Sequence, residues 1–236
     1  NAIYQVLDIK NKKSISKLIL TASGGPFLNK NIEDLKDITP EQAIKHPNWS
    51  MGKKISVDSA TMMNKVFEII EAKKIFNLSY KKLSILVHPK SYIHAIIKLK
   101  NGLTKIVAHD TNMKIPIFNS LYSSNKFINS KKLNLKILNN LTLKEIDYKR
   151  FSVIKILTKL PENSSLFETI LVSINDKLVE LFLANKIKFT DIPKKMHNML
   201  DLNELKKYKM IKPRKINDIL FLNNKIRSKI VIKNKI

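Results

Sequence analysis

The hydrophobic pattern of the chain changes once, between about residues 123 and 148, and this change limits the folds that the sequence can adopt. Before this segment, short apolar runs are bounded by Gly, Pro and Asn, as strands usually are. After it, apolar residues recur at spacings of three and four, which is typical of amphipathic helices. The segment 123–148 is rich in Ser, Asn and Lys and is interpreted as a linker. We therefore predict an α+β protein with domains at 1–122 and 149–236.

The first domain is predicted to hold a small mixed sheet of at least three strands, flanked by helices and a loop flap. Residues 18–22 and 84–88 are short apolar runs. Residues 93–99 and 104–108 flank an Asn-Gly dipeptide, the usual two-residue hairpin turn. The second domain is predicted to be a four-helix bundle, with helices at 149–160, 165–186, 191–209 and 214–232.

Composition excludes several classes of protein. At 44% hydrophobic residues the chain can fill a core, and its lack of cysteine excludes disulfides and fits a reducing compartment, so we expect a cytoplasmic location. No apolar run approaches the roughly 18 residues of a membrane-spanning helix, so no membrane partner is expected. The chain opens at Asn1 rather than Met, so we expect its natural start to lie upstream.

The net charge of +25 suggests one alternative function, a basic nucleic-acid-binding module. However, the lysines are spread along the chain without a nucleic-acid-binding motif. Aromatic residues do not alternate with basic residues as a stacking surface requires. We therefore attribute the charge to compositional drift and expect no specific nucleic-acid partner.

Residues 58–76 carry the pattern with the clearest chemistry, an amphipathic helix capped by Asp58 or Ser59. Its apolar side holds Met62, Met63, Val66, Phe67, Ile69 and Ile70, and its other side holds Asn64, Lys65, Glu68, Glu71 and Ala72. An ordinary solvated face, with a weak Lys–Glu pair, is one interpretation. The functional interpretation is that Asn64 and Lys65 hold an oxyanion near the helix N-terminus while Glu68 reaches a cation.

The placement of glycine supports an anion site. The chain has only four glycines, and the loop Ser23-Gly24-Gly25 directly follows the first predicted strand. A hydroxyl beside two glycines lets backbone N–H groups approach a phosphate. Gly52 lies in a second candidate loop and Gly102 in the hairpin turn, so we predict special backbone conformations at all four positions.

Four motifs, in one order and at one spacing, resemble the 1-deoxy-D-xylulose 5-phosphate reductoisomerase family. They are TASGGPF at 21–27, HPNWSMGKKI at 46–55, VDSATMMNK at 57–65 and HPKSYIH at 88–94. The resemblance is close from about residue 17 to 118 and traceable to the end. It implies an oxidoreductase and isomerase of the non-mevalonate isoprenoid pathway. With NADPH and Mg²⁺ or Mn²⁺, the family converts 1-deoxy-D-xylulose 5-phosphate to 2-C-methyl-D-erythritol 4-phosphate, as a homodimer.

The resemblance also implies roles for single residues. Ser23, Ser59, Asn64 and Lys65 would bind the substrate phosphate. Glu68 would be a metal ligand that also contacts the substrate. Together with Lys65 and with His46 from the flap, Glu68 forms the implied catalytic set.

The other implied contacts lie in and beyond the flap. Trp49 would cover the substrate, and Met51, Gly52 and Met113 would approach NADPH. His88 and His94 match motif positions, with the alternative that they only orient their neighbours, whereas surface or structural roles are expected for His109 and His197.

The chain departs from the family pattern at three places. An Asp-Ser-Glu-His motif with two further metal ligands, and the NADPH-binding Rossmann domain before it, precede Asn1 in the family. We therefore expect the isolated chain to be an inactive fragment, and a decayed remnant of the enzyme is a further alternative. The family's PDMR reads TNMK at 111–114, and its NAANE reads VSIND at 172–176.

Overall fold

The computed structural model describes residues 2–6, 13–47, 49–122 and 126–230, so Asn48 of the predicted flap lies outside the described residues. The chain divides into two compact units, each assembled from separate stretches. The first unit comprises Asn1–Gly25, Pro47–Ser50 and Phe67–Asp147, and the second comprises Pro26–His46, Met51–Val66 and Tyr148–Ile236. The mixture of helices and strands confirms the predicted α+β class.

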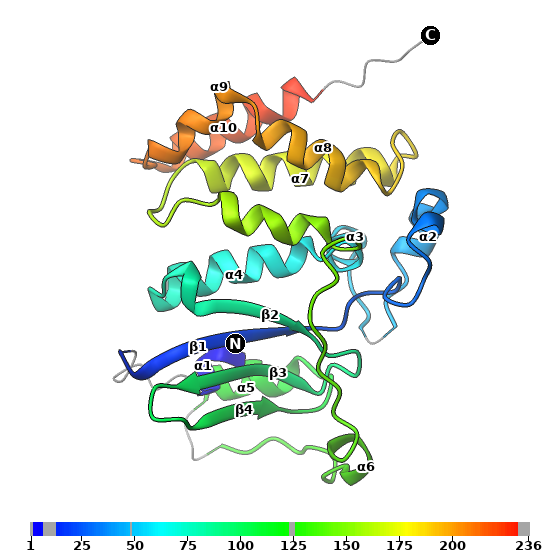
Figure 1. Ribbon diagram of the computed structural model, residues 1–236, viewed down its shortest axis with the longest axis vertical. Coiled ribbons are helices and arrows are strands. Elements are labelled where there is room, and N and C mark those ends of the chain that lie inside the picture. The colour runs from blue at the N-terminus through cyan, green and yellow to red at the C-terminus, as the bar shows by residue number, and fades with distance from the viewer. Residues whose placement is uncertain (1, 7–12, 48, 123–125, 231–236) are drawn as a thin grey trace. The chain divides into compact units, whose positions relative to one another are not determined.

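A four-stranded mixed sheet is the framework of the first unit (Figure 1). Its strands are β1 (Ile15–Ala22), β2 (Leu83–Val87), β3 (Ile93–Leu99) and β4 (Thr104–Ala108), in the order β2-β1-β3-β4. Strand β1 pairs parallel with β2 and antiparallel with β3, and β3 and β4 form an antiparallel hairpin. The predicted small mixed sheet is therefore confirmed. Strand β4 lies at the edge of this sheet and is mostly exposed.

Apolar residues of the central strands form the core of the first unit. Leu18 of β1 and Ile93 and Ile97 of β3 are almost fully buried. Helices α1 (Ala2–Val6) and α5 (Lys114–Leu121) contact each other, and α1 contacts β3 and β4. The unit also contains a 3₁₀ turn, Tyr80–Lys82, before β2.

The segment predicted as a linker contains some ordered structure. It includes the short helix α6 (Leu135–Leu138), and Lys144 forms an isolated antiparallel bridge with Val87 at the end of β2. Backbone hydrogen bonds of 2.9 Å join Lys144 and Val87 in both directions. The low periodicity of the sequence hides this contact, because a single bridge needs no repeating pattern.

Helix α7 is the centre of the second unit (Figure 1). It contacts α3, α8, α9 and α10, and it buries Phe167, Ile170, Leu171, Ile174 and Phe182 almost completely. The helices of this unit are α2 (Pro40–Ala43), α3 (Lys53–Thr61), α7 (Phe167–Leu183), α8 (Asp191–Leu200), α9 (Asn203–Lys206) and α10 (Ile216–Lys229). Short 3₁₀ segments span Glu33–Asp37, Ser152–Lys159 and Lys207–Met210.

Two of the four predicted C-terminal helices differ from the prediction. The first is the 3₁₀ helix Ser152–Lys159, and the third is interrupted between α8 and α9. The interruption occurs because Leu202 adopts an extended conformation, with φ −63° and ψ 128°. The preceding residue, Asp201, is the C-cap of α8 and forms an ion pair with Lys159 at 2.7 Å. No helix among the described residues is both long and apolar enough to cross a bilayer.

Candidate functional site

The single helix predicted for residues 58–76 is in fact two helices. Helix α3 ends at Thr61, and α4 (Met63–Phe76) begins after Met62, which adopts the left-handed conformation with φ 67° and ψ 11°. Asp58 and Ser59 therefore lie in the last turns of α3, and the prediction that either caps a helix is wrong. A left-handed Met costs about 1–2 kcal/mol, and burial of its side chain, which is 2% exposed, offsets this cost.

The break creates a helix N-terminus beside two predicted phosphate ligands. Asn64 and Lys65 lie in the first turn of α4, where the helix dipole favours negative charge, and the Lys65 N–H donates to the Met62 carbonyl oxygen at 3.1 Å. The Met63 N–H donates to Thr61 Oγ1 at 3.3 Å, so Thr61 caps this start. Two of the predicted anion-binding residues, Asn64 and Lys65, therefore lie in the first turn of α4, and a third, Ser59, lies in the last turn of α3.

Most residues of α4 have the burial that the predicted apolar and polar faces require. Asn64, Lys65 and Glu68 are half-buried, and Glu68 follows Asn64 by four residues, about one helical turn. Met63, Val66, Ile69 and Ile70 are buried as predicted. Ala72, predicted on the polar side, is only 2% exposed, because the buried sector of α4 is wider than the pattern indicates. Phe67, predicted to be apolar core, is half-buried.

The loop after β1 has the backbone that its glycines predict. Gly24 and Gly25 have φ values of 85° and 67°, and both are buried. The Gly25 N–H donates to Ser23 Oγ at 3.2 Å, which fixes the Ser23 hydroxyl over the loop. A side chain at either glycine would be strained, so the loop requires glycine here.

The prediction of a special backbone conformation is confirmed at only one of the other two glycines. Gly102 has a φ of 90° in the β3–β4 turn, as predicted. Gly52 has an ordinary φ of −64° as the N-cap of α3, so the prediction of a special conformation there is wrong. No atom lies within 4 Å of the position where a Cβ on Gly52 would stand, so a ligand can approach this backbone closely.

Three residues of the predicted flap are half-buried. His46 is half-buried, and burial lowers the pKa of its imidazole, which favours the neutral ring at neutral pH. Trp49 and Met51 are also half-buried. Met113 is 48% exposed and directly precedes α5.

The remaining histidines contact backbone carbonyl oxygens. The buried His88 contacts the Thr142 carbonyl oxygen through Nδ1 at 2.8 Å. His94 stacks on His109 with ring centroids 3.6 Å apart and contacts the His109 carbonyl oxygen through Nε2. His197 contacts the Ser152 carbonyl oxygen through Nε2 at 3.0 Å.

The residues described do not by themselves make a metal centre. Across the described ranges, no three His, Cys, Asp or Glu side chains gather in a way that could hold a metal ion. Glu68 offers one hard oxygen ligand of the kind that Mg²⁺ and Mn²⁺ prefer.

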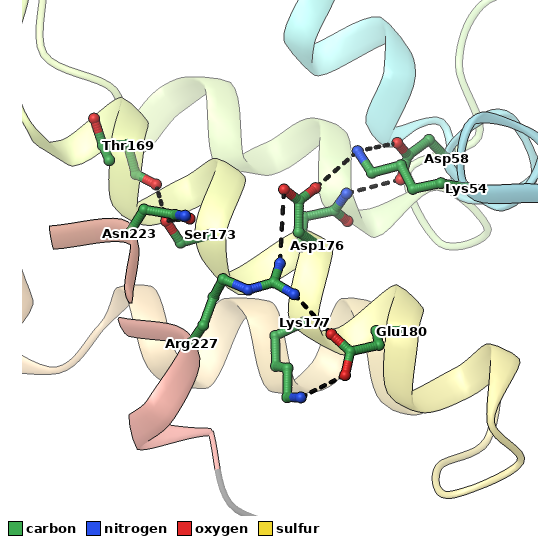
Figure 2. Close-up of polar contacts among 10 residues, drawn as sticks. Lys54, Asp58, Thr169, Ser173, Asp176, Lys177, Glu180, Asn223 and Arg227 are labelled. Carbon is green, nitrogen blue, oxygen red and sulfur yellow. Dashed lines mark hydrogen bonds and ion pairs between the residues drawn. The ribbon is translucent and has the colours of Figure 1, made fainter. Parts of the chain in front are cut away.

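The sequence prediction missed a polar cluster in the second unit (Figure 2). The side chain of Asp58, 2% exposed, lies 2.6 Å from Lys54 Nζ and accepts a hydrogen bond from Asn175 Nδ2 at 2.7 Å. Lys54 Nζ also lies 3.0 Å from Asp176. Two signals were present, namely the i, i+4 spacing of Lys54 and Asp58, and the Asn-Asp pair at the end of the VSIND motif.

The pKa values of this cluster reflect its burial. Burial raises the pKa of Asp58 despite the opposing effects of Lys54 and Asn175. Burial acts to lower the pKa of Lys54, but the charges and hydrogen bonds of Asp58 and Asp176 outweigh it and raise that pKa.

Comparison with known proteins identifies the family. Residues 109–229, a little more than half of the chain, match the DXP reductoisomerase C-terminal domain. The chain belongs to the DXP reductoisomerase family. Residues 1–76 match a second DXP reductoisomerase region, described as the 1-deoxy-D-xylulose 5-phosphate reductoisomerase C-terminal domain.

Several DXP reductoisomerases match nearly the whole chain. That of Pelagibacter ubique is 57% identical over 97% of the chain and 59% of its own length, and that of Persephonella marina is 40% identical over 94% and 58%. A crystal structure of a DXP reductoisomerase in complex with NADPH, fosmidomycin and magnesium matches with a TM-score of 0.86 and 33% identity, over 96% of the chain and 59% of that protein. The Zymomonas mobilis enzyme in complex with NADPH matches with a TM-score of 0.82 and 30% identity, over 96% and 57%. The chain thus spans about 59% of the length of the curated relatives.

Proposed function

We propose that this chain is the substrate-binding part of an enzyme that converts 1-deoxy-D-xylulose 5-phosphate to 2-C-methyl-D-erythritol 4-phosphate, with NADPH and Mg²⁺ or Mn²⁺. One observation carries the proposal. Asn64 and Lys65 begin a helix, and Glu68 follows one turn later, at positions that match the family's motif. The family membership supports the same reaction.

In this proposal the start of α4 binds the substrate phosphate. The positive end of the α4 dipole and the Lys65 ammonium would supply the positive charge that a phosphate requires. Asn64 and the hydroxyls of Ser59 and Ser23 add neutral hydrogen-bond donors. Binding energy gained on the phosphate, remote from the reacting carbons, can orient the substrate for the chemical steps.

The flap residues orient and shield the substrate. His46, with its lowered pKa, is a neutral ring that can both donate and accept a hydrogen bond with a substrate hydroxyl. The indole of Trp49 covers the substrate and excludes water from it. NADPH supplies the hydride that reduces the aldehyde formed by the rearrangement. The open backbone at Gly52, with Met51 and Met113, suits contact with that cofactor.

We further propose that the protein works as a homodimer in the cytoplasm. The exposed edge strand β4 supports self-association, because its unpaired backbone and the apolar side chains Leu103 and Ile106, which are 60% and 52% exposed, remain uncovered by the described residues. Size-exclusion chromatography with light scattering measures the molecular mass in solution and so distinguishes a dimer from a monomer. A monomer at micromolar concentration contradicts the dimer.

Activity is tested with protein expressed from the complete gene. We expect loss of NADPH absorbance when 1-deoxy-D-xylulose 5-phosphate and Mg²⁺ are added. Glu68→Gln keeps the shape of the side chain but removes its charge, so it should abolish most turnover. Glu71→Gln, an exposed position on the same helix, is the matched control and should retain it.

The outcomes separate the assignments. No substrate-dependent oxidation of NADPH by the wild type contradicts the proposed reaction and favours an inactive remnant. Full turnover by Glu68→Gln contradicts only the role of Glu68. The family match gives no support to a nucleic-acid-binding module. Sub-micromolar affinity for duplex DNA at physiological salt would support that alternative.

A further inference from the structure

The cluster around Asp58 is one end of a longer charged network within the second unit (Figure 2). From Lys54 the network passes to Asp176 of α7, whose other oxygen lies 3.9 Å from Nη1 of Arg227 on α10. Arg227 Nη2 donates to Glu180 at 2.7 Å, and Glu180 also pairs with Lys177. Charges of alternating sign therefore connect α3 through α7 to α10.

The end of this network at Asp58 is an unfavourable place for a charge. Desolvation dominates at Asp58, since burial raises its pKa in spite of the adjacent Lys54. Asn175 is fully buried, and its Oδ1 has no hydrogen-bond partner in the described part of the chain. The pair joins the buried Asp58 to Lys54, which is 44% exposed, and the cost of removing the carboxylate from water opposes the attraction between the two charges. Stability alone therefore does not explain the network.

What the network does provide is a fixed geometry at the end of α3. Both carboxylate oxygens of Asp58 are held, Oδ2 by Lys54 and Oδ1 by Asn175 of α7. The backbone carbonyl oxygen of Asp58 accepts a hydrogen bond from Thr61 Oγ1 at 3.2 Å. The same Thr61 oxygen accepts from the Met63 N–H, the first amide of α4. A continuous series of hydrogen bonds thus runs from Asn175 through Asp58 and Thr61 to the start of α4.

We infer that Asp58 and Asn175 are positioning residues for the phosphate site, holding the end of α3 against α7 so that Ser59 and the first turn of α4 keep their arrangement. The inference rests on the proposed function, because the start of α4 must bind phosphate for its position to matter. Neither residue needs to touch the substrate.

The test compares phosphate affinity with stability. Inorganic phosphate is titrated into the purified protein and followed by ³¹P NMR, while urea denaturation gives stability. The first variant combines Lys54→Met, Asp58→Leu and Asn175→Leu, which replaces the cluster with apolar groups. It should be as stable as the wild type but bind phosphate at least about tenfold more weakly, equivalent to roughly 1.4 kcal/mol.

Exchanging the side chains of Asp58 and Asn175 tests whether the hydrogen bond between them sets the affinity for phosphate. Asn175→Asp should weaken phosphate binding because it places two carboxylates opposite one another, and Asp58→Asn should weaken it because Lys54 loses its carboxylate partner. The double exchange again places one amide opposite one carboxylate, so it should recover affinity relative to Asn175→Asp. Ser173→Ala is the matched control. It removes a 2.7 Å contact between Ser173 of α7 and Asn223 of α10 that does not involve α3, and it should bind phosphate normally.

Each of the following results contradicts the inference or the proposed function on which it rests. Wild-type affinity in the folded apolar variant overturns the inference, and so does a double exchange that binds phosphate no better than Asn175→Asp. An apolar variant that fails to fold also overturns it, because the network would then be needed for stability. If the wild type itself does not bind phosphate, the proposed function fails as well, and that failure is seen before any variant is made.

Discussion

Removing Lys54 alone should leave the Asp58 carboxylate buried without its counter-charge. Breaking a buried pair from one side typically costs about 3–5 kcal/mol. The Lys54 side chain is 44% exposed, so water can replace part of its effect, and we expect Lys54→Met to lower the free energy of unfolding by about 2 kcal/mol at neutral pH. With a urea slope of about 2–3 kcal/mol/M, the unfolding midpoint should fall by roughly 0.7–1 M.

The pH dependence of this loss provides the sharper test. Loss of Lys54 raises the folded-state pKa of Asp58 further above its ordinary value of 3.8, and the nearby Asp176 acts in the same direction. A raised folded-state pKa contributes stability that is complete below the unfolded pKa and is lost as the pH rises through the folded pKa. The difference between variant and wild type should therefore be smallest near pH 3.8 and grow as the pH rises above it.

Urea denaturation followed by circular dichroism, repeated from acid to neutral pH, measures both quantities. Lys177→Met is the control, since Lys177 pairs with the half-exposed Glu180, and it should cost less than about 0.5 kcal/mol. A Lys54→Met loss below that size, or one that does not change with pH, would refute this account of the Asp58 environment.

Three further predictions concern the proposed phosphate site and the flap. Lys65→Ala should weaken binding of the phosphorylated substrate by about 10–100-fold, from a charge-assisted hydrogen bond of about 1.5–3 kcal/mol; calorimetry with the phosphorylated and dephosphorylated sugar checks it, and equal wild-type affinity for both would contradict it. Thr61→Val should destabilise the protein by about 1 kcal/mol in urea, because α4 loses its cap, whereas Thr158→Val, which removes only a bond to the Lys155 carbonyl, should cost less. In a proton NMR titration, burial should place the midpoint of His46 below its ordinary 6.5, and a midpoint above that value would show that its imidazole is not desolvated as described.

The strands were predictable because each is a short apolar run ended by a turn signal. The same reasoning located the glycine conformations at Gly24, Gly25 and Gly102, where the backbone enters the left-handed region. It failed at Gly52, because an N-cap position and a ligand-facing position can both hold glycine without a positive φ.

The break at Met62 was not predictable from spacing. A methionine fits an apolar helix pattern, and nothing in the pattern shows that one residue leaves the helix. Tertiary burial of Met62 decides its conformation against the local preference. The site residues Asn64, Lys65 and Glu68 were still found together, since all three follow the break and share one helix.

The polar cluster was unpredictable for a different reason. Asp58 and Asn175 lie 117 positions apart, and no periodicity links residues so far apart in sequence. Only the family motif around Asn175 marked that position, and the motif alone does not say what the side chain contacts.

The left-handed Met62 also has a consequence for the direction in which a ligand binds. It places the carbonyl end of α3, which is partially negative, next to the amide end of α4, which is partially positive. Hydroxyl groups are attracted to the first end and an oxyanion to the second. In the proposed function, the negative terminus of a phosphorylated sugar would face the start of α4, and its hydroxyl groups would face the end of α3.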